Sequence, residues 1–309
     1  MEDGMKLTRR QFTTSAIGTG VALAAAGPAV FADELELIRR PIPSSGETIP
    51  IVGLGTNRYG VDESEAARAP LREALARFHA LGGTVVDTAP GYRTSESVLG
   101  DLISELGIFD DLFVATKADR TDGRDWTAAQ MESSIDKLRG EPIDLMQVHN
   151  LRGINEALPL MLEWKNEGRI RYVGITTSRS NQYSEFENVM REWDLDFVQV
   201  NYSLEQREAA DRLMPLAADR GMAVIINRAF GGGRIFQTVG DQPLPDWAGE
   251  FATSWAQFLL KYALSHPAAT VAIPGMTKVH HVEDNLLAAT GRMPDADERQ
   301  QMETYYAAL

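Results

Sequence analysis

The chain has 309 residues, 44% of them hydrophobic, with no cysteine and a formal net charge of −14 at pH 7. This length allows a large core in one catalytic domain, and the negative charge argues against a nucleic acid or an anionic membrane as partner. The lack of thiols excludes disulfides, thiolate metal sites and cysteine nucleophiles, and the five scattered histidines suggest no metal cluster, so we expect no metal.

The N-terminus has the features of an export signal. Arg9 and Arg10 precede an apolar segment rich in alanine and glycine, and a stretch of small residues ends at Ala32. Residues 1–32 therefore resemble a twin-arginine signal; the alternative is a disordered or amphipathic arm. The apolar segment is shorter than the roughly 20 residues that span a membrane. We expect the twin-arginine (Tat) export machinery to deliver a mature chain without a membrane anchor, residues 33–309, to the periplasm or another exported location.

The rest of the chain alternates between strand-like and helix-like patterns. Residues 35–50 contain proline and Ser-Gly turn signals and predict a short hairpin or arm. The predicted strands are residues 51–55, 84–87, 112–117, 143–149, 171–176, 197–201, 223–227 and 270–273. The predicted helices are one around residues 71–81, one at 96–106 with Ser95 as its cap, and those at 127–139, 155–166, 182–192, 205–220 and 247–265.

Eight strand and helix units of this length predict an α/β fold, a single-domain (β/α)8 TIM barrel with an N-terminal hairpin and extra C-terminal helices. A long insert rich in glycine and proline, residues 228–245, separates the seventh strand from its helix. A doubly wound sheet is the alternative, but the Gly-x-Gly-x-x-Gly fingerprint is absent after the first strand.

Four ionisable residues follow the ends of three neighbouring strands. Asp87 ends the second strand and Tyr92 comes five residues later, while Lys117 and His149 end the third and fourth strands. Barrel enzymes carry their chemistry at the carboxyl ends of the strands, so these side chains are expected to meet at one mouth. Taken singly, each has a simpler explanation as a packing residue, a cap or a solvated cation.

From about Ile49 to Asn285 the chain resembles the aldo-keto reductases. The resemblance is carried by an ordered set of motifs: Gly53-Leu54-Gly55-Thr56, Asp87 to Tyr92, Lys117, His149, Gln199 and Ile273-Pro274-Gly275. It implies an NAD(P)(H)-dependent enzyme that interconverts an aldehyde or ketone and an alcohol by hydride transfer. It also implies that the catalytic residues are Asp87, Tyr92, Lys117 and His149.

The chemistry of these four groups is consistent with that reaction. Hydride transfer to a carbonyl leaves negative charge on oxygen, which needs a proton donor and hydrogen-bonding support. Tyr92 is a poor acid alone, but the ammonium of Lys117 would favour its phenolate and lower its pKa. Asp87 would hold Lys117 charged, and His149 would orient the carbonyl through one ring nitrogen.

The same resemblance implies a dinucleotide site. The cofactor is expected to be NADP, with NAD as the open alternative, because Gly275 and Met276 replace the cations that often follow Ile-Pro in the family. A 2′-phosphate would then depend on Arg228, Lys278 or His281. The implied cofactor-binding residues are Gly55, Thr56, Thr176, Thr177, Gln199, Asn227, Arg228, Gly231, Pro274, Gly275, Lys278, His281, Asp284 and Asn285.

Asn227 departs from the family pattern, and Gly231 has a simpler explanation than cofactor binding. Asn227 stands where many members have a tyrosine that stacks on nicotinamide. Gly231 opens a run of three glycines that could bring backbone N–H groups to a pyrophosphate, or form only a flexible loop. Because the stacking residue is missing, a nicotinamide-binding sensory or regulatory subunit with little turnover is an alternative to the enzyme.

The resemblance also implies a small-molecule carbonyl or alcohol as the substrate. Loops after the first, second and fourth strands and the long insert are expected to build its pocket. The candidate lining residues are Asn57, Arg58, Tyr59, Arg93, Trp126, Asn150 and Arg152.

Overall fold

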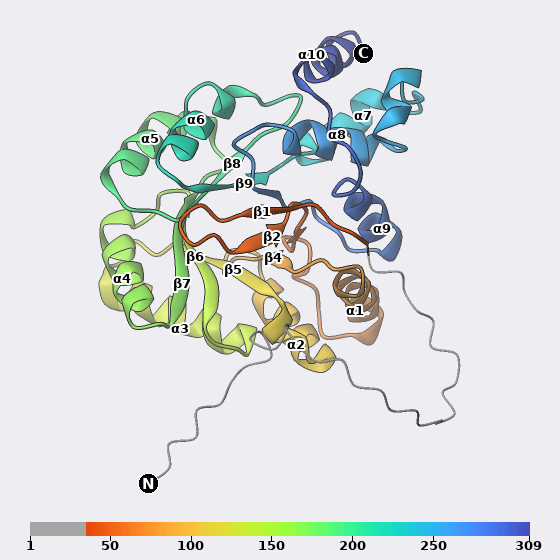
Figure 1. Ribbon diagram of the computed structural model, residues 1–309. Coiled ribbons are helices and arrows are strands. Elements are labelled where there is room, and N and C mark those ends of the chain that lie inside the picture. The colour runs from red at the N-terminus through yellow and green to blue at the C-terminus, as the bar shows by residue number, and fades with distance from the viewer. Residues whose placement is uncertain (1–34) are drawn as a thin grey trace, which may run out of the picture. The chain divides into compact units, whose positions relative to one another are not determined.

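Eight parallel strands form one curved sheet in the computed structural model, which describes residues 35–309 (Figure 1). The expected signal, residues 1–32, lies outside the described residues. The strands follow one another in chain order across the sheet: β3 (Leu54–Gly55), β4 (Val85–Asp87), β5 (Phe113–Ala118), β6 (Ile143–His149), β7 (Ile170–Thr176), β8 (Phe197–Asn201), β9 (Ala223–Asn227) and β10 (Val271–Ala272).

The sheet closes on itself. Val52 and Gly55 form parallel bridges to Ala272 and Gly275, and the Gly53 N–H donates to the Ala272 carbonyl at 2.8 Å. The (β/α)8 barrel is thereby confirmed. The predicted first strand, residues 51–55, is shortened to Leu54–Gly55 because the preceding residues make only these isolated bridges.

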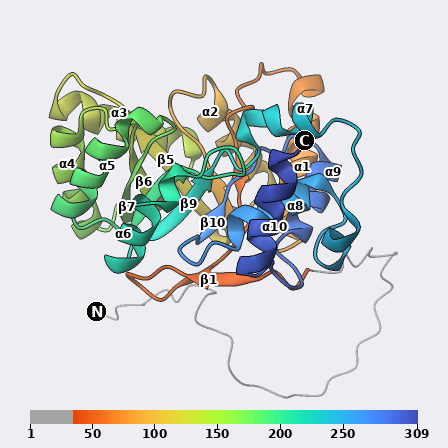
Figure 2. The same cartoon turned by 90° about the horizontal axis from the view of Figure 1, so that it is seen from above.

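Helices surround the barrel (Figures 1 and 2). They are α1 (Glu65–Ala80), α2 (Ser95–Leu106), α3 (Arg124–Leu138), α4 (Ile154–Asn166), α5 (Tyr183–Glu192), α6 (Leu213–Asp219), α7 (Arg234–Val239), α8 (Trp255–Leu264), α9 (Val279–Leu287) and α10 (Ala296–Ala307). The last of these lies beyond the repeating units, in agreement with the expected C-terminal extension. No helix of residues 35–309 has the length and apolar character needed to cross a membrane.

Side chains alternate between the barrel interior and the helix layer. On β5, Phe113 and Ala115 belong to the interior cluster, whereas Val114 packs in the outer core beneath the helices. The period of two residues then places Lys117 inside the barrel, at the end where the strands finish. The same alternation on β6 brings His149 to that end, above Leu145.

A hairpin covers the opposite end of the barrel, as predicted. Its strands are β1 (Arg39–Pro41) and β2 (Thr48–Pro50), which pair antiparallel. Ile42 and Ile49 of this hairpin belong to the interior cluster and are buried. The hairpin therefore forms the floor of the barrel, opposite the mouth at the carboxyl ends of the strands.

Two predicted helices are shorter than expected. The helix predicted over residues 205–220 begins only at Leu213, because Ser203 accepts hydrogen bonds from two following backbone N–H groups and holds a turn. The helix predicted over residues 247–265 begins at Trp255, where the Ser254 hydroxyl accepts from the Gln257 N–H, after a separate 3-10 turn. Both errors arise from local hydrogen bonds that interrupt an apolar pattern.

One further expectation is corrected. Ser95 does not cap α2 but is its first residue, and its hydroxyl donates instead to the Thr56 carbonyl at 2.8 Å. The insert of residues 228–245 contains a short helix, α7.

Candidate active site

Lys117 and Asp87 form a buried ion pair at the mouth. The Lys117 ammonium donates to Asp87 Oδ1 and to the Thr88 carbonyl, each at 2.7 Å, and the two charged side chains are 1% and 3% exposed. Gln147 donates to the second carboxylate oxygen at 3.3 Å. Burial acts to lower the pKa of Lys117, but Asp87 and Tyr92 outweigh it and raise that pKa above its ordinary value. Lys117 therefore stays positively charged.

Tyr92 and His149 lie next to this cation. The Lys117 ammonium is 5.2 Å from the centre of the Tyr92 ring, and the rings of Tyr92 and His149 meet edge to face at 6.1 Å. Burial, with the nearby Lys117 charge, lowers the pKa of His149 to about 4. Its imidazole is therefore neutral at pH 7 and offers one N–H donor. The four predicted catalytic residues, which we call the tetrad, do come together in space.

A hydroxyl network fixes the loops that carry the tetrad. The Thr56 hydroxyl donates to the Asp87 carbonyl at 2.9 Å, and the Ser95 and Thr88 hydroxyls lie 3.1 Å apart. All three side chains are buried. Ser95 thus joins the loops after β3 and β4, a role that its position before a predicted helix did not reveal.

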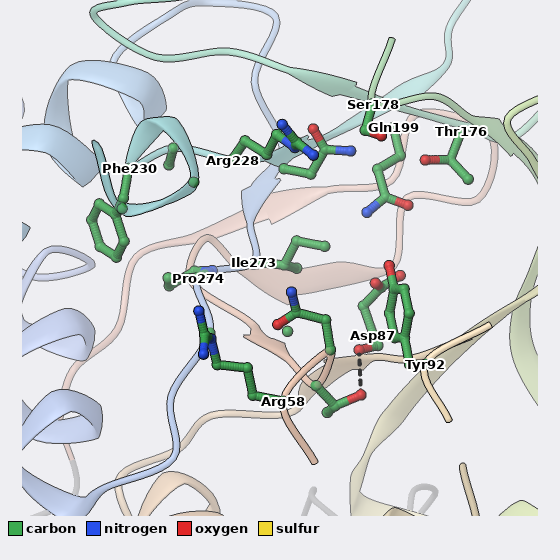
Figure 3. Close-up of a pocket in the computed structure, with 18 of the residues that line it drawn as sticks. Arg58, Asp87, Tyr92, Thr176, Ser178, Gln199, Arg228, Phe230, Ile273 and Pro274 are labelled. Atoms are coloured by element: carbon green, nitrogen blue, oxygen red, sulfur yellow. Dashed lines mark hydrogen bonds between the residues drawn. The ribbon is translucent and has the colours of Figure 1, made fainter. Parts of the chain in front are cut away.

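A cavity of about 560 Å³ opens above these residues (Figure 3). It brings together the tetrad and most of the predicted cofactor positions. Those that line it are Gly55, Thr56, Thr176, Gln199, Asn227, Arg228, Pro274, Gly275 and His281. Of the predicted substrate residues, Asn57 and Arg58 line the same cavity.

Five predicted cofactor residues do not line the cavity: Thr177, Gly231, Lys278, Asp284 and Asn285. The Thr177 hydroxyl is used internally, with Gln182 at 2.6 Å. Asp284 accepts from Ser254 and Gln257 at 2.8 and 2.7 Å and so supports the start of α8.

The other three are placed by packing or by their position near α9. Gly231 packs so closely on Glu205 that an added Cβ would lie 2.5 Å from the carboxylate. Lys278 is exposed at the start of α9, and Asn285 is buried within that helix.

The cavity also contains residues that the sequence did not single out as functional. The most prominent are Phe230 and Phe236, whose rings lie 5.1 Å apart and which come from the insert after β9. In the sequence, these aromatic residues stand on both sides of the run of three glycines, a pattern that could have marked them as candidates. Ser178 and Thr277 line the cavity as well.

The polar groups of the cavity are suited to a nicotinamide ring. Gln199 is 2% exposed, and its side-chain oxygen has no hydrogen-bond partner within residues 35–309; the oxygen of Asn227 is likewise unpartnered there. A buried amide oxygen without a donor is costly, and a carboxamide NH2 would satisfy it. Gly55 fits the adjoining wall, since a Cβ there would lie 2.6 Å from the Ile273 carbonyl oxygen.

Metal ligands are not grouped in a comparable way. Residues 35–309 contain no group of three or more histidine, aspartate or glutamate side chains that could hold an ion. The site is thus best described by its hydrogen-bonding groups, its cations and its aromatic rings.

The sequence of the chain is similar to that of known proteins of one family. The model of the Aldo/keto reductase family matches residues 51–304. The aldo-keto reductase YhdN of Bacillus subtilis is 29% identical over 208 residues, which cover 60% of this chain and 60% of that protein. YqkF of the same species, an uncharacterized oxidoreductase, is 25% identical over 304 residues, covering 86% and 96% of the two chains.

A solved structure agrees with the sequence comparisons. It is an aldo/keto reductase from Klebsiella pneumoniae in complex with NADP and acetate, with 25% identity and a TM-score of 0.66 over 84% of this chain and 93% of that one. The fold, the family match and the assembled mouth agree. The chain therefore belongs to the aldo/keto reductase family of NAD(P)H-dependent oxidoreductases.

Proposed function

We propose that the protein interconverts an aldehyde or ketone and an alcohol with NADP(H), and that Tyr92 donates the proton to the carbonyl oxygen. The observation that carries this proposal is the buried Lys117 ammonium, held by Asp87 at 2.7 Å and lying 5.2 Å from the Tyr92 ring. The nicotinamide, when bound, supplies or accepts the hydride.

The protein's own residues then perform the proton chemistry. Lys117 stabilises the negative charge that develops on the Tyr92 oxygen as its proton leaves. Asp87 keeps Lys117 charged despite its burial. The neutral His149 donates its one N–H toward the carbonyl oxygen, where negative charge develops.

The cofactor would be held mainly by residues that line the cavity. Gln199 and Thr176 would hold the carboxamide, because the side-chain oxygen of Gln199 has no hydrogen-bond donor within residues 35–309. Arg228 and His281, farther along the cavity, would serve the phosphates. The NADP complex of the Klebsiella pneumoniae relative supports NADP over NAD.

The experiment is Tyr92→Phe, with turnover and cofactor binding measured on the same samples. The enzyme proposal predicts a loss of turnover of roughly 10²–10⁴-fold with cofactor affinity retained. Tyr183→Phe is the matched control, because Tyr183 bonds a backbone carbonyl away from the cavity. Undiminished turnover in Tyr92→Phe would contradict the role of Tyr92. If the wild type binds the cofactor but turns over no carbonyl compound, the regulatory alternative is favoured.

We further propose that the chain is exported with the signal of residues 1–32. The support is the sequence pattern of Arg9, Arg10 and the small residues that end at Ala32. Replacing both arginines by lysine should retain the protein in the cytoplasm at its full length, whereas the wild type should be recovered outside it with Asp33 as its first residue. Cytoplasmic wild-type protein that starts at Met1 would contradict the proposal.

A further inference from the structure

Most lysine and arginine side chains of residues 35–309 have partners there. Arg68, for example, pairs with Asp101, and Lys261 donates to two backbone carbonyls. For five cations, residues 35–309 provide neither an ion pair nor a side-chain hydrogen bond: Arg58, Arg93, Arg179, Arg228 and Lys278.

These unpartnered cations share one location. They lie in the segments that directly follow β3, β4, β7, β9 and β10, all of which begin at the mouth. The chain as a whole carries a formal charge of −14, so carboxylates are plentiful elsewhere. Uncompensated positive charge confined to one end of an acidic protein indicates a ligand that brings negative charge to that end.

Only Arg58 and Arg228 of these five line the cavity. In the closed barrel β10 lies between β9 and β3, so the two arginines reach the cavity from the loops on either side of Pro274. Figure 3 shows them on opposite sides of Pro274, with Tyr92, Gln199 and Thr176 at one end of the site and Phe230 at the other. The two arginines thus lie between Tyr92, where the reaction takes place, and Phe230.

We propose that Arg58 and Arg228 bind the 5′-diphosphate of the dinucleotide from opposite walls of the cavity. The assignment rests on the proposed function, which places the nicotinamide at Tyr92 and Gln199. Beyond its ribose, the diphosphate is the next charged group along such a ligand, and the two arginines are the next cations along the cavity. Each guanidinium offers several N–H donors in a fork that matches phosphate oxygens.

The two residues that directly follow Pro274, Gly275 and Met276, carry no charge, and Lys278 of the same segment does not line the cavity. Arg228 and Arg58 supply positive charge to the cavity from the two neighbouring loops. A small carbonyl substrate that lies at Tyr92 would not need arginines on two opposite walls of the cavity. An extended ligand with two phosphates would contact both arginines.

The test is a titration of NADPH and NADH, followed by nicotinamide fluorescence, on the wild type and the variants Arg58→Met and Arg228→Met. Each variant should weaken the binding of both cofactors by the same factor, about 10- to 100-fold, because each removes one charged contact to a group that both cofactors share. Arg93→Met is the matched control: it removes an unpartnered arginine at the same mouth but outside the cavity, and it should bind both cofactors as the wild type does.

Other outcomes overturn the assignment. A loss confined to NADPH would mean that the arginines serve the 2′-phosphate. Unchanged affinities combined with a raised KM for 4-carboxybenzaldehyde, but not for benzaldehyde, would assign them to an anionic substrate. Arg58→Lys and Arg228→Lys keep the charge and should recover part of the affinity, which a folding defect at either position would not predict. Failure of the wild type to bind either cofactor would instead refute the proposed function.

Discussion

The floor and the mouth of the barrel differ in whether their polar side chains have partners within the fold. At the floor, Asp144 accepts the Val114 N–H at 2.7 Å and pairs with Arg171, which also pairs with Glu47. The Tyr172 hydroxyl lies 2.8 Å from the same glutamate. Each of these charged groups has a partner of opposite charge or a hydrogen bond within the fold.

At the mouth several groups lack such partners. The buried side-chain oxygens of Gln199 and Asn227 have no hydrogen-bond partner within residues 35–309, and the exposed Arg58 and Arg228 have no carboxylate partner there. A buried polar group left unpaired costs about 1–3 kcal/mol. The difference indicates that the floor stabilises the fold, whereas the mouth keeps hydrogen-bonding capacity for a ligand.

The largest effect should come from breaking the buried ion pair between Lys117 and Asp87 at the mouth. Lys117→Met leaves the Asp87 carboxylate buried with only Gln147 as a side-chain donor. We expect turnover to fall roughly 10²–10⁴-fold and the free energy of unfolding to fall by about 3–5 kcal/mol, measured by steady-state kinetics and urea unfolding.

The double variant Asp87→Asn with Lys117→Met separates these two effects. It removes both charges, so it should regain stability but not turnover. Turnover near the wild-type level in either variant would contradict the role of Lys117.

A substitution at the floor should affect stability alone. Arg171→Met leaves Asp144 and Glu47 without their shared cation, and we expect it to lower the free energy of unfolding by about 2–4 kcal/mol. At temperatures where the variant stays folded, kcat and the cofactor Kd should match the wild type. An altered Kd would show that the two ends of the barrel are coupled.

The third effect is a pH dependence of stability. Burial lowers the pKa of His149 at the mouth, and of His266 near Arg299, to about 4. An unfolded histidine titrates near 6.5, so between pH 6.5 and 4 the unfolded state binds more protons. Stability should therefore be fully present above pH 6.5 and decline as the pH falls toward 4, by about 2–3 kcal/mol for each histidine.

Two variants test which histidine causes this decline. His149→Gln and His266→Gln should each flatten the dependence of Tm on pH below 6.5, but only His149→Gln should reduce turnover. If neither variant changes the slope, the two histidines are not held neutral in the folded protein.

Local sequence patterns predicted most of the barrel. The predicted bounds of β6, β8 and β9 agree with the structure. These strands are rich in β-branched and other apolar residues and end at polar ones, so the pattern itself marks the boundary. For the same reason the sequence located Asp87, Lys117 and His149 at strand ends.

Features that depend on contacts between distant loops were not predictable in this way. Ser95 bonds a carbonyl 39 residues away, which no helical period reveals. Phe230 and Phe236 come together only because α7 folds within the insert. The lack of partners around Arg58 could be recognised only once the ion pairs of the other arginines were known.

The measurement that tests the account most directly is a single turnover with NADPH deuterated at both C4 positions. Enzyme, cofactor and a panel of aromatic and aliphatic aldehydes and ketones are mixed, and the alcohol products are weighed by mass spectrometry. The account predicts that one deuterium reaches the carbonyl carbon with the wild type and that Tyr92→Phe, with its cofactor bound, transfers almost none in the same time. Bound NADPH that delivers no deuterium to any member of the panel would contradict it.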